Sequence, residues 1–118
     1  MTIRDEKQFI QNFWDWRFLD HAFDRNIKVG DIDGFVEAGG NFLFIEGKRA
    51  GTPIPKGQRD ALLRLSRLKP VSVIIVEGMP PCEVTQWMVL GKGHTYQGNS
   101  QEFAAFVRMW FKNGELPT

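Results

Sequence analysis

The chain has little of what stabilises secreted or membrane proteins. It has one cysteine among 118 residues, Cys82, so no internal disulfide can form. A single thiol fits a reducing compartment, and a small side chain without chemistry is the simplest interpretation of Cys82. No apolar run, 73–76 included, is long enough to cross a bilayer, and the first ten residues carry no apolar signal core. These absences predict a soluble, cytoplasmic protein.

An excess of one charge is also missing. Fifteen basic against fourteen acidic residues leave a formal charge of +1, so nucleic-acid binding would need a local basic patch. The only histidines, His21 and His94, have no paired spacing, which argues against a zinc site. What is present, 42% hydrophobic and 25% charged residues, predicts a single domain over residues 1–118 with an ordinary core.

Periodic patterns predict the order of the elements. Apolar residues from Asp5 to Phe23 recur at helical spacing, which predicts an amphipathic helix with its aromatic side chains in the core or a dimer contact. A short strand near Ile27 is the next candidate. Two alternating runs, 31–37 and 41–48, flank a Gly-Gly pair and predict a β-hairpin. The remaining predictions are a helix over 58–68, a strand buried on both faces over 71–78, an outer strand over 83–93 and a helix over 100–111. The predicted class is α/β, with a central mixed sheet flanked by helices.

The hairpin carries charge on both of its strands. With the turn at the glycines, Asp33 and Glu46 lie opposite each other, with β-carbons about 5 Å apart. Two carboxylates at this distance repel, and a hard cation such as Mg²⁺ or Mn²⁺ would relieve the repulsion more than Lys48 alone. A solvated hairpin face with incidental ion pairs, Asp31 included, fits the spacing equally well.

The same hairpin resembles the PD-(D/E)XK nuclease superfamily, in which an acidic residue on one strand is followed by Glu-x-Lys on the next. Here these are Asp33, which follows isoleucine rather than the literal proline, and Glu46-Gly47-Lys48. The segments GDIDG and FLFIEGK and a Gly-Gln at a helix start are similar to small phage members near the VRR-NUC and Holliday-junction resolvase branches. Over most of the chain, the predicted order of elements is similar to the restriction-endonuclease-like αβββαβ core.

The resemblance implies a metal-dependent endonuclease that hydrolyses phosphodiester bonds. It implies that Asp33, Glu46 and the Gly47 carbonyl bind Mg²⁺ or Mn²⁺. Lys48 would hold or polarise the attacking water, and Gln58 would orient the lysine, the water or a phosphate.

Two further groups of residues complete the predicted site. Many members of the superfamily carry a glutamate on the first helix, for which Glu6 is the candidate and Asp15 and Asp20 are alternatives. Basic residues beside the motif could hold a nucleic-acid backbone without reading its sequence: Arg49, Lys56 and Arg59. Arg64 and Arg67 are interpreted as a solvated helix face, and the segment 91–99 lacks the pattern of a phosphate-binding P-loop.

The predicted substrate is DNA, selected by structure rather than by sequence, since the chain leaves little room for a recognition domain. Branched DNA such as a Holliday junction is favoured, because a homodimer would present two active sites to two strands. The aromatic residues of the first helix or the segment FVRMWF could form the dimer contact. Two alternatives stay open: a nuclease that trims single strands or ends, and a catalytically silent module that binds DNA or protein.

Overall fold

The computed structural model describes residues 14–117 and divides into two units at residue 31. Within the first unit, the predicted helix lies outside the described residues up to position 13. From Trp16–Ala22 the chain forms a 3₁₀ helix, η1, that buries none of its residues. The side chains of Trp14, Trp16 and Phe18 are exposed, so the core position predicted for them is wrong. No strand forms near Ile27 in the described chain, which also corrects the prediction. Most helical stability in proteins comes from packing of an apolar face, and η1 buries none of its residues.

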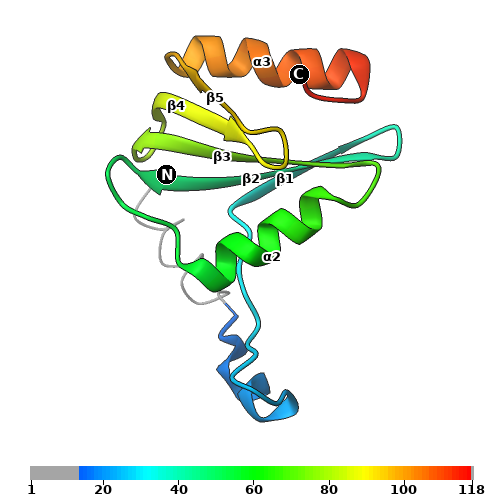
Figure 1. Ribbon diagram of the computed structural model, residues 1–118, viewed down its shortest axis with the longest axis vertical. Coiled ribbons are helices and arrows are strands. Elements are labelled where there is room, and N and C mark those ends of the chain that lie inside the picture. The colour runs from blue at the N-terminus through cyan, green and yellow to red at the C-terminus, as the bar shows by residue number, and fades with distance from the viewer. Residues whose placement is uncertain (1–13, 118) are drawn as a thin grey trace, which may run out of the picture. The chain divides into compact units, whose positions relative to one another are not determined.

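The second unit is built on a five-stranded sheet in the order β1-β2-β3-β4-β5. β2 and β3 run parallel, and every other neighbouring pair is antiparallel (Figure 1). The predicted mixed sheet of an α/β protein is therefore confirmed. The strands are β1 (Gly34–Ala38), β2 (Asn41–Arg49), β3 (Val71–Met79), β4 (Glu83–Val89) and β5 (His94–Gln97).

The predicted hairpin is confirmed, with β1 and β2 joined at Gly39 and Gly40. Both glycines have positive φ, +60° and +87°, a conformation that side chains other than glycine rarely adopt. The pairing runs from Ala38 opposite Asn41 to Gly34 opposite Ile45. β1 begins three residues later than predicted, so the acidic residues at 31 and 33 precede the strand.

The two helices lie on opposite faces of the sheet (Figure 1). Helix α2 (Lys56–Ser66) places Leu62 against Val73 and Ile75, and helix α3 (Ser100–Asn113) places Trp110 against Ile74. Successive side chains of a strand point to opposite faces, so β3 is buried on both, as predicted. None of the described helices is long and apolar enough to span a membrane.

The outer strand was predicted wrongly. β4 lies between β3 and β5, and the edge of the sheet is β5, a strand that the sequence pattern did not predict. β5 is only four residues long and mostly exposed, so it carries little hydrophobic periodicity. The C-terminal helix is confirmed, and Asn99 caps it in a reciprocal pair with Glu102.

Candidate functional site

A buried carboxylate lies where β2 extends beyond its partner β1. Only 7% of Glu46 is exposed, although β2 places it near the end of the sheet. Gln58, in the first turn of α2, donates its Nε2 hydrogen to Glu46 Oε1 at 2.6 Å. The backbone N–H of Asp33 donates to Glu46 Oε2 at 3.4 Å. Three predicted site residues, from the approach to β1, from β2 and from α2, therefore meet at one carboxylate.

The carboxylate of Asp33 engages the edge of β2. Its Oδ2 accepts a hydrogen bond from the Gly47 N–H at 2.8 Å. In an extended strand, the N–H and C=O of one residue point to the same side, so the Gly47 carbonyl also faces this edge. The β1–β2 ladder has already ended at Gly34 and Ile45, and β1 offers this carbonyl no partner. The structure therefore brings the Asp33 carboxylate to the Gly47 peptide, while the role of the Gly47 carbonyl as a metal ligand stays a prediction.

Lys48 is held on the face of the sheet that Glu46 occupies, since the two are separated by one residue. Its Nζ lies 3.3 Å from Glu77 Oε2 and donates to the Thr52 carbonyl at 2.9 Å. Lys48 and Glu77 are direct partners in the parallel β2–β3 ladder. Both side chains are largely buried, at 23% and 15% exposure, which makes this pair more constrained than a surface ion pair.

Glu77 is the residue of this site that the sequence analysis missed. Its carboxylate accepts hydrogen bonds from Gln86 Nε2 at 2.6 Å and from the Gly51 N–H at 3.1 Å. The hydrogen bond from Gln86, that from Gly51 and the neighbouring Lys48 together hold the pKa of Glu77 below its ordinary value. The sequence does show an acidic residue, Glu77, directly after the β-branched run 73–76. The run alone does not show which residue of the neighbouring strand lies beside Glu77.

The lowered pKa of Glu77 predicts an acid-sensitive contribution to stability. The unfolded chain binds a proton at Glu77 more readily than the folded chain, so this contribution is complete above the ordinary glutamate pKa, about 4.3. It is lost as the pH falls through the lower folded value. The thermal midpoint of the wild type should therefore fall more between about pH 5 and pH 3 than that of Glu77→Gln, as followed by circular dichroism. Equal falls in the two proteins would contradict this assignment.

The predicted backbone-binding residues do not form one cluster of free cations. Lys56 Nζ lies 3.0 Å from Asp60 Oδ2 within the first turn of α2, and its hydrogen bond lowers the pKa of Asp60. Arg59 is exposed one turn into the same helix. Arg49 ends β2, and its Nη1 lies 4.0 Å from Met79 Sδ. Of these three residues, Arg49 is the one next to the Glu-x-Lys motif in the sequence, and it lines a hollow beside the site.

The predicted acidic residue from the first helix remains a prediction. Glu6 lies outside the described residues. Of the alternatives, Asp15 caps η1 and is bound by the Arg17 guanidinium, and hydrogen bonds from Arg17 lower the pKa of Asp15 to about 2. Asp20 lies within η1. Both belong to the unit that ends at residue 31.

The donors at the hairpin fit a hard divalent cation. Carboxylate oxygens of Asp33 and Glu46 and the Gly47 carbonyl are the ligand types that Mg²⁺ and Mn²⁺ prefer. Within residues 14–117, no three acidic, histidine or cysteine side chains form a group that could hold a metal. Mg²⁺ is commonly bound through one or two carboxylates, with waters and substrate phosphates completing its shell. Two carboxylates and a carbonyl therefore suffice for such a site.

Comparisons of the chain with protein-family models, with curated proteins and with solved structures find no match. The functional interpretation therefore depends on the chemistry of these residues.

Proposed function

We propose that the protein is a metal-dependent endonuclease that hydrolyses phosphodiester bonds in DNA. One observation carries the proposal: the buried Glu46 carboxylate accepts hydrogen bonds from the Asp33 backbone N–H and from the Gln58 side chain, so three residues that the resemblance names meet at one place. Lys48 lies one pleat further along the same strand and on the same face. Incidental polar contacts on a protein surface would not be expected to bring residues from three separate elements to one buried carboxylate.

The residues divide the chemistry between them. A bound Mg²⁺ or Mn²⁺ would lower the pKa of a coordinated water and neutralise charge that grows on the phosphate. Lys48 adds a positive charge beside it, and Glu77 with the Thr52 carbonyl fixes where its ammonium lies. Gln58 restricts the Glu46 carboxylate to one orientation, which reduces the reorganisation that cation binding would require.

The local topology supports the same proposal. A hairpin that carries the acidic residue and Glu-x-Lys is followed by helix α2 and then by β3, which runs parallel to β2. The resemblance implies this arrangement for the αβββαβ core. Among the described residues two strands, rather than three, precede α2, and β4 and β5 follow β3, so the likeness to that core is limited to the hairpin, the helix and the parallel strand.

For the substrate, we propose DNA with branches or unpaired segments, cut by a homodimer. Within residues 32–117, the sheet and helices form the core and the proposed site. Backbone contacts from Arg49 and Arg59 would position a strand independently of its bases. Trimming of single strands or ends is a second substrate class, which the same active site could serve.

The experiment that tests this function compares labelled substrates of one sequence. The purified full chain is incubated with a four-way junction, a flap, a single strand and a plain duplex, each in Mg²⁺, Mn²⁺ or EDTA. We expect cleavage of the junction or the flap in either metal, slower cleavage of the duplex and none in EDTA. Cleavage that persists in EDTA contradicts metal dependence. If folded protein cleaves no substrate in either metal, the endonuclease proposal fails and a binding module takes its place.

A further inference from the structure

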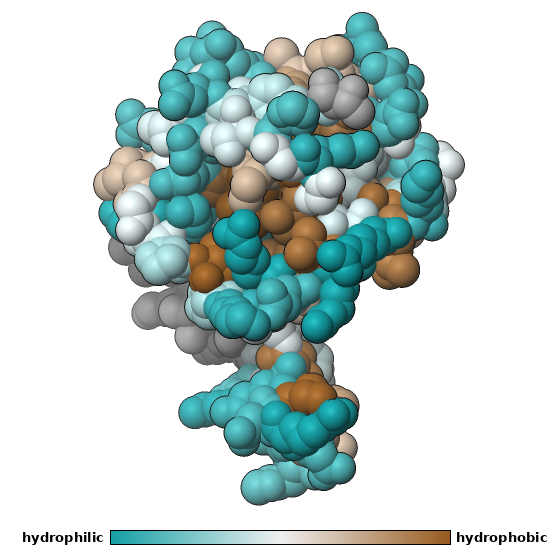
Figure 2. All heavy atoms as spheres, viewed as in Figure 1, coloured by the Kyte–Doolittle hydropathy of each residue, from teal (hydrophilic) through white to brown (hydrophobic). Residues whose placement is uncertain are grey.

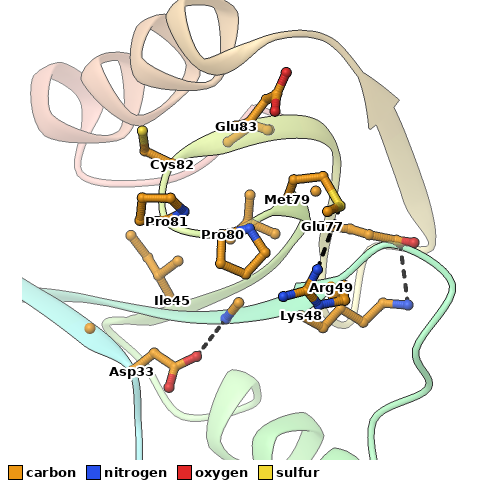
Figure 3. A pocket seen from close by; sticks show the side chains of 15 residues that line it. Asp33, Ile45, Lys48, Arg49, Glu77, Met79, Pro80, Pro81, Cys82 and Glu83 are labelled. Carbon is orange, nitrogen blue, oxygen red and sulfur yellow. Dashed lines mark hydrogen bonds and ion pairs between the residues drawn. The ribbon is translucent and has the colours of Figure 1, made fainter.

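A hollow of about 430 Å³ lies beside the proposed catalytic residues. Its floor is formed by Ile45, Val76 and Val84, which pack against the core under α3. The turn between β3 and β4 forms a second wall with Pro80 and Pro81 (Figure 3). The hollow therefore opens on the α3 side of the sheet, whereas Glu46 faces α2. Lys48 and its partner Glu77 also line the hollow.

Two glycines at neighbouring strand positions, Gly34 and Gly47, leave this hollow open, whereas the Glu83 carbonyl lies against Gly78. Gly34, Gly47 and Gly78, one on each of β1, β2 and β3, all line it. A β-carbon at Gly34 would meet nothing within 4 Å, and one at Gly47 would contact only Asp33 Oδ2 and Val76. Gly34 pairs with Ile45, so any side chain at Gly34 would point into the hollow. One side chain at this position would therefore occupy part of it.

The walls of the hollow suit a flat, apolar group that carries polar edges. Its volume is within the 300–1,000 Å³ typical of pockets for small organic groups. Arg49 lies at its rim with its guanidinium turned toward Met79 (Figure 3). Seen from one side, the unit shows apolar side chains gathered over its middle and hydrophilic ones around them (Figure 2). A phosphate would meet apolar walls and the carboxylates of Asp33, Glu77 and Glu83 here, and Lys48 is already paired with Glu77. A nucleobase could instead stack on the prolines and the Arg49 guanidinium.

We propose that this hollow binds an unpaired nucleobase of the substrate strand. The inference rests on the proposed function, because it places the phosphodiester of the same strand at Asp33 and Glu46. Asp33 and Gly47 connect the proposed metal site with the hollow. Their hydrogen bond lies at the edge of the proposed metal site, and both residues line the hollow. A base and its phosphate are attached to the same sugar, so a base can enter the hollow only if the hollow lies next to the site that binds the phosphate. Bases in a duplex are stacked and paired and enter such a pocket only at the cost of unstacking.

The test measures binding separately from cleavage. A fluorescein-labelled oligothymidine single strand and a labelled duplex are titrated with the full chain in Ca²⁺, and fluorescence anisotropy gives each affinity. We expect the wild type to bind the single strand more tightly than the duplex. Gly34→Leu, which places a side chain in the hollow, and Arg49→Ala, which removes a cation at the rim, should each weaken single-strand binding by about tenfold, the effect of losing one stacked base. Duplex binding by Gly34→Leu should change less than twofold.

The control is Gly30→Leu, since a β-carbon at Gly30 also meets nothing within 4 Å and Gly30 does not line the hollow. It should bind both DNAs as the wild type does. Single-strand binding that is unchanged in both Gly34→Leu and Arg49→Ala overturns the inference, as does a wild type that binds duplex at least as tightly. If the wild type cleaves nothing and both variants still lose single-strand affinity, the nuclease proposal fails and the base site stands. If the wild type cleaves DNA and both variants bind the single strand normally, the base site fails and the nuclease proposal stands.

Discussion

Replacement of Asp33 by asparagine is expected to lower the rate of DNA cleavage by about a thousandfold, and Glu46→Gln should do the same. Both substitutions keep the size of the side chain and remove its negative charge, which is what a divalent cation requires of its ligands. An asparagine at position 33 can keep its amide oxygen near the Gly47 N–H, so we expect the fold to survive. Initial rates on the best substrate, at saturating Mg²⁺ and with equal protein, measure the loss.

The matched control is Asp31→Asn, the same change two residues earlier. Asp31 is exposed and makes no contact with Glu46 or Gly47 among those found in the structure, so cleavage should stay within about twofold of wild type. Equal losses in Asp31→Asn and Asp33→Asn would indicate a general effect of acidic charge. Full activity in Asp33→Asn would show that the cation, if there is one, is bound elsewhere.

Asp33 and Glu46 could be predicted as neighbours because local information sets their register. The two glycines with positive φ fix the turn, and alternation then decides which residues of β2 face α2. Gln58 was predictable only through the resemblance, since the contact joins α2 to β2 across an irregular loop. No periodic pattern specifies how such a loop returns its helix to the sheet.

What escaped prediction depends on contacts between segments far apart in the sequence. The partner of Lys48 follows from the parallel register of β2 and β3, which places Glu77 beside it. The hollow requires the turn after β3 to fold over Gly78, where an added β-carbon would lie 1.9 Å from the Glu83 carbonyl oxygen. The core position predicted for the aromatic residues near η1 was wrong for a related reason. Helical spacing shows that a segment has an apolar face, but not that anything packs against it.

Replacement of Trp110 by alanine should have the largest effect on stability, a loss of about 3 kcal/mol in the free energy of unfolding. Trp110 is 1% exposed and is among the largest fully buried side chains of the described residues. It joins α3 to the sheet through a cluster that includes Leu43 and Ile74. Its buried indole N–H has no hydrogen-bond acceptor within the described part of the chain, which offsets part of its contribution. We therefore expect the lower end of the 3–5 kcal/mol range for such truncations, measured by urea unfolding.

Phe111→Ala is the matched control, because Phe111 is the next residue of the same helix and is 61% exposed. It should change the free energy of unfolding by less than about 0.5 kcal/mol, since an exposed aromatic side chain gains little from folding. Equal losses in the two variants would indicate that the outer face of α3 is covered by a partner, such as a second copy of the chain. A loss confined to Trp110→Ala places the stability beneath α3, in the layer that includes Ile45 and Val76. The same layer is the floor of the hollow, so loosening it should also weaken single-strand binding, whereas duplex binding through the backbone should persist.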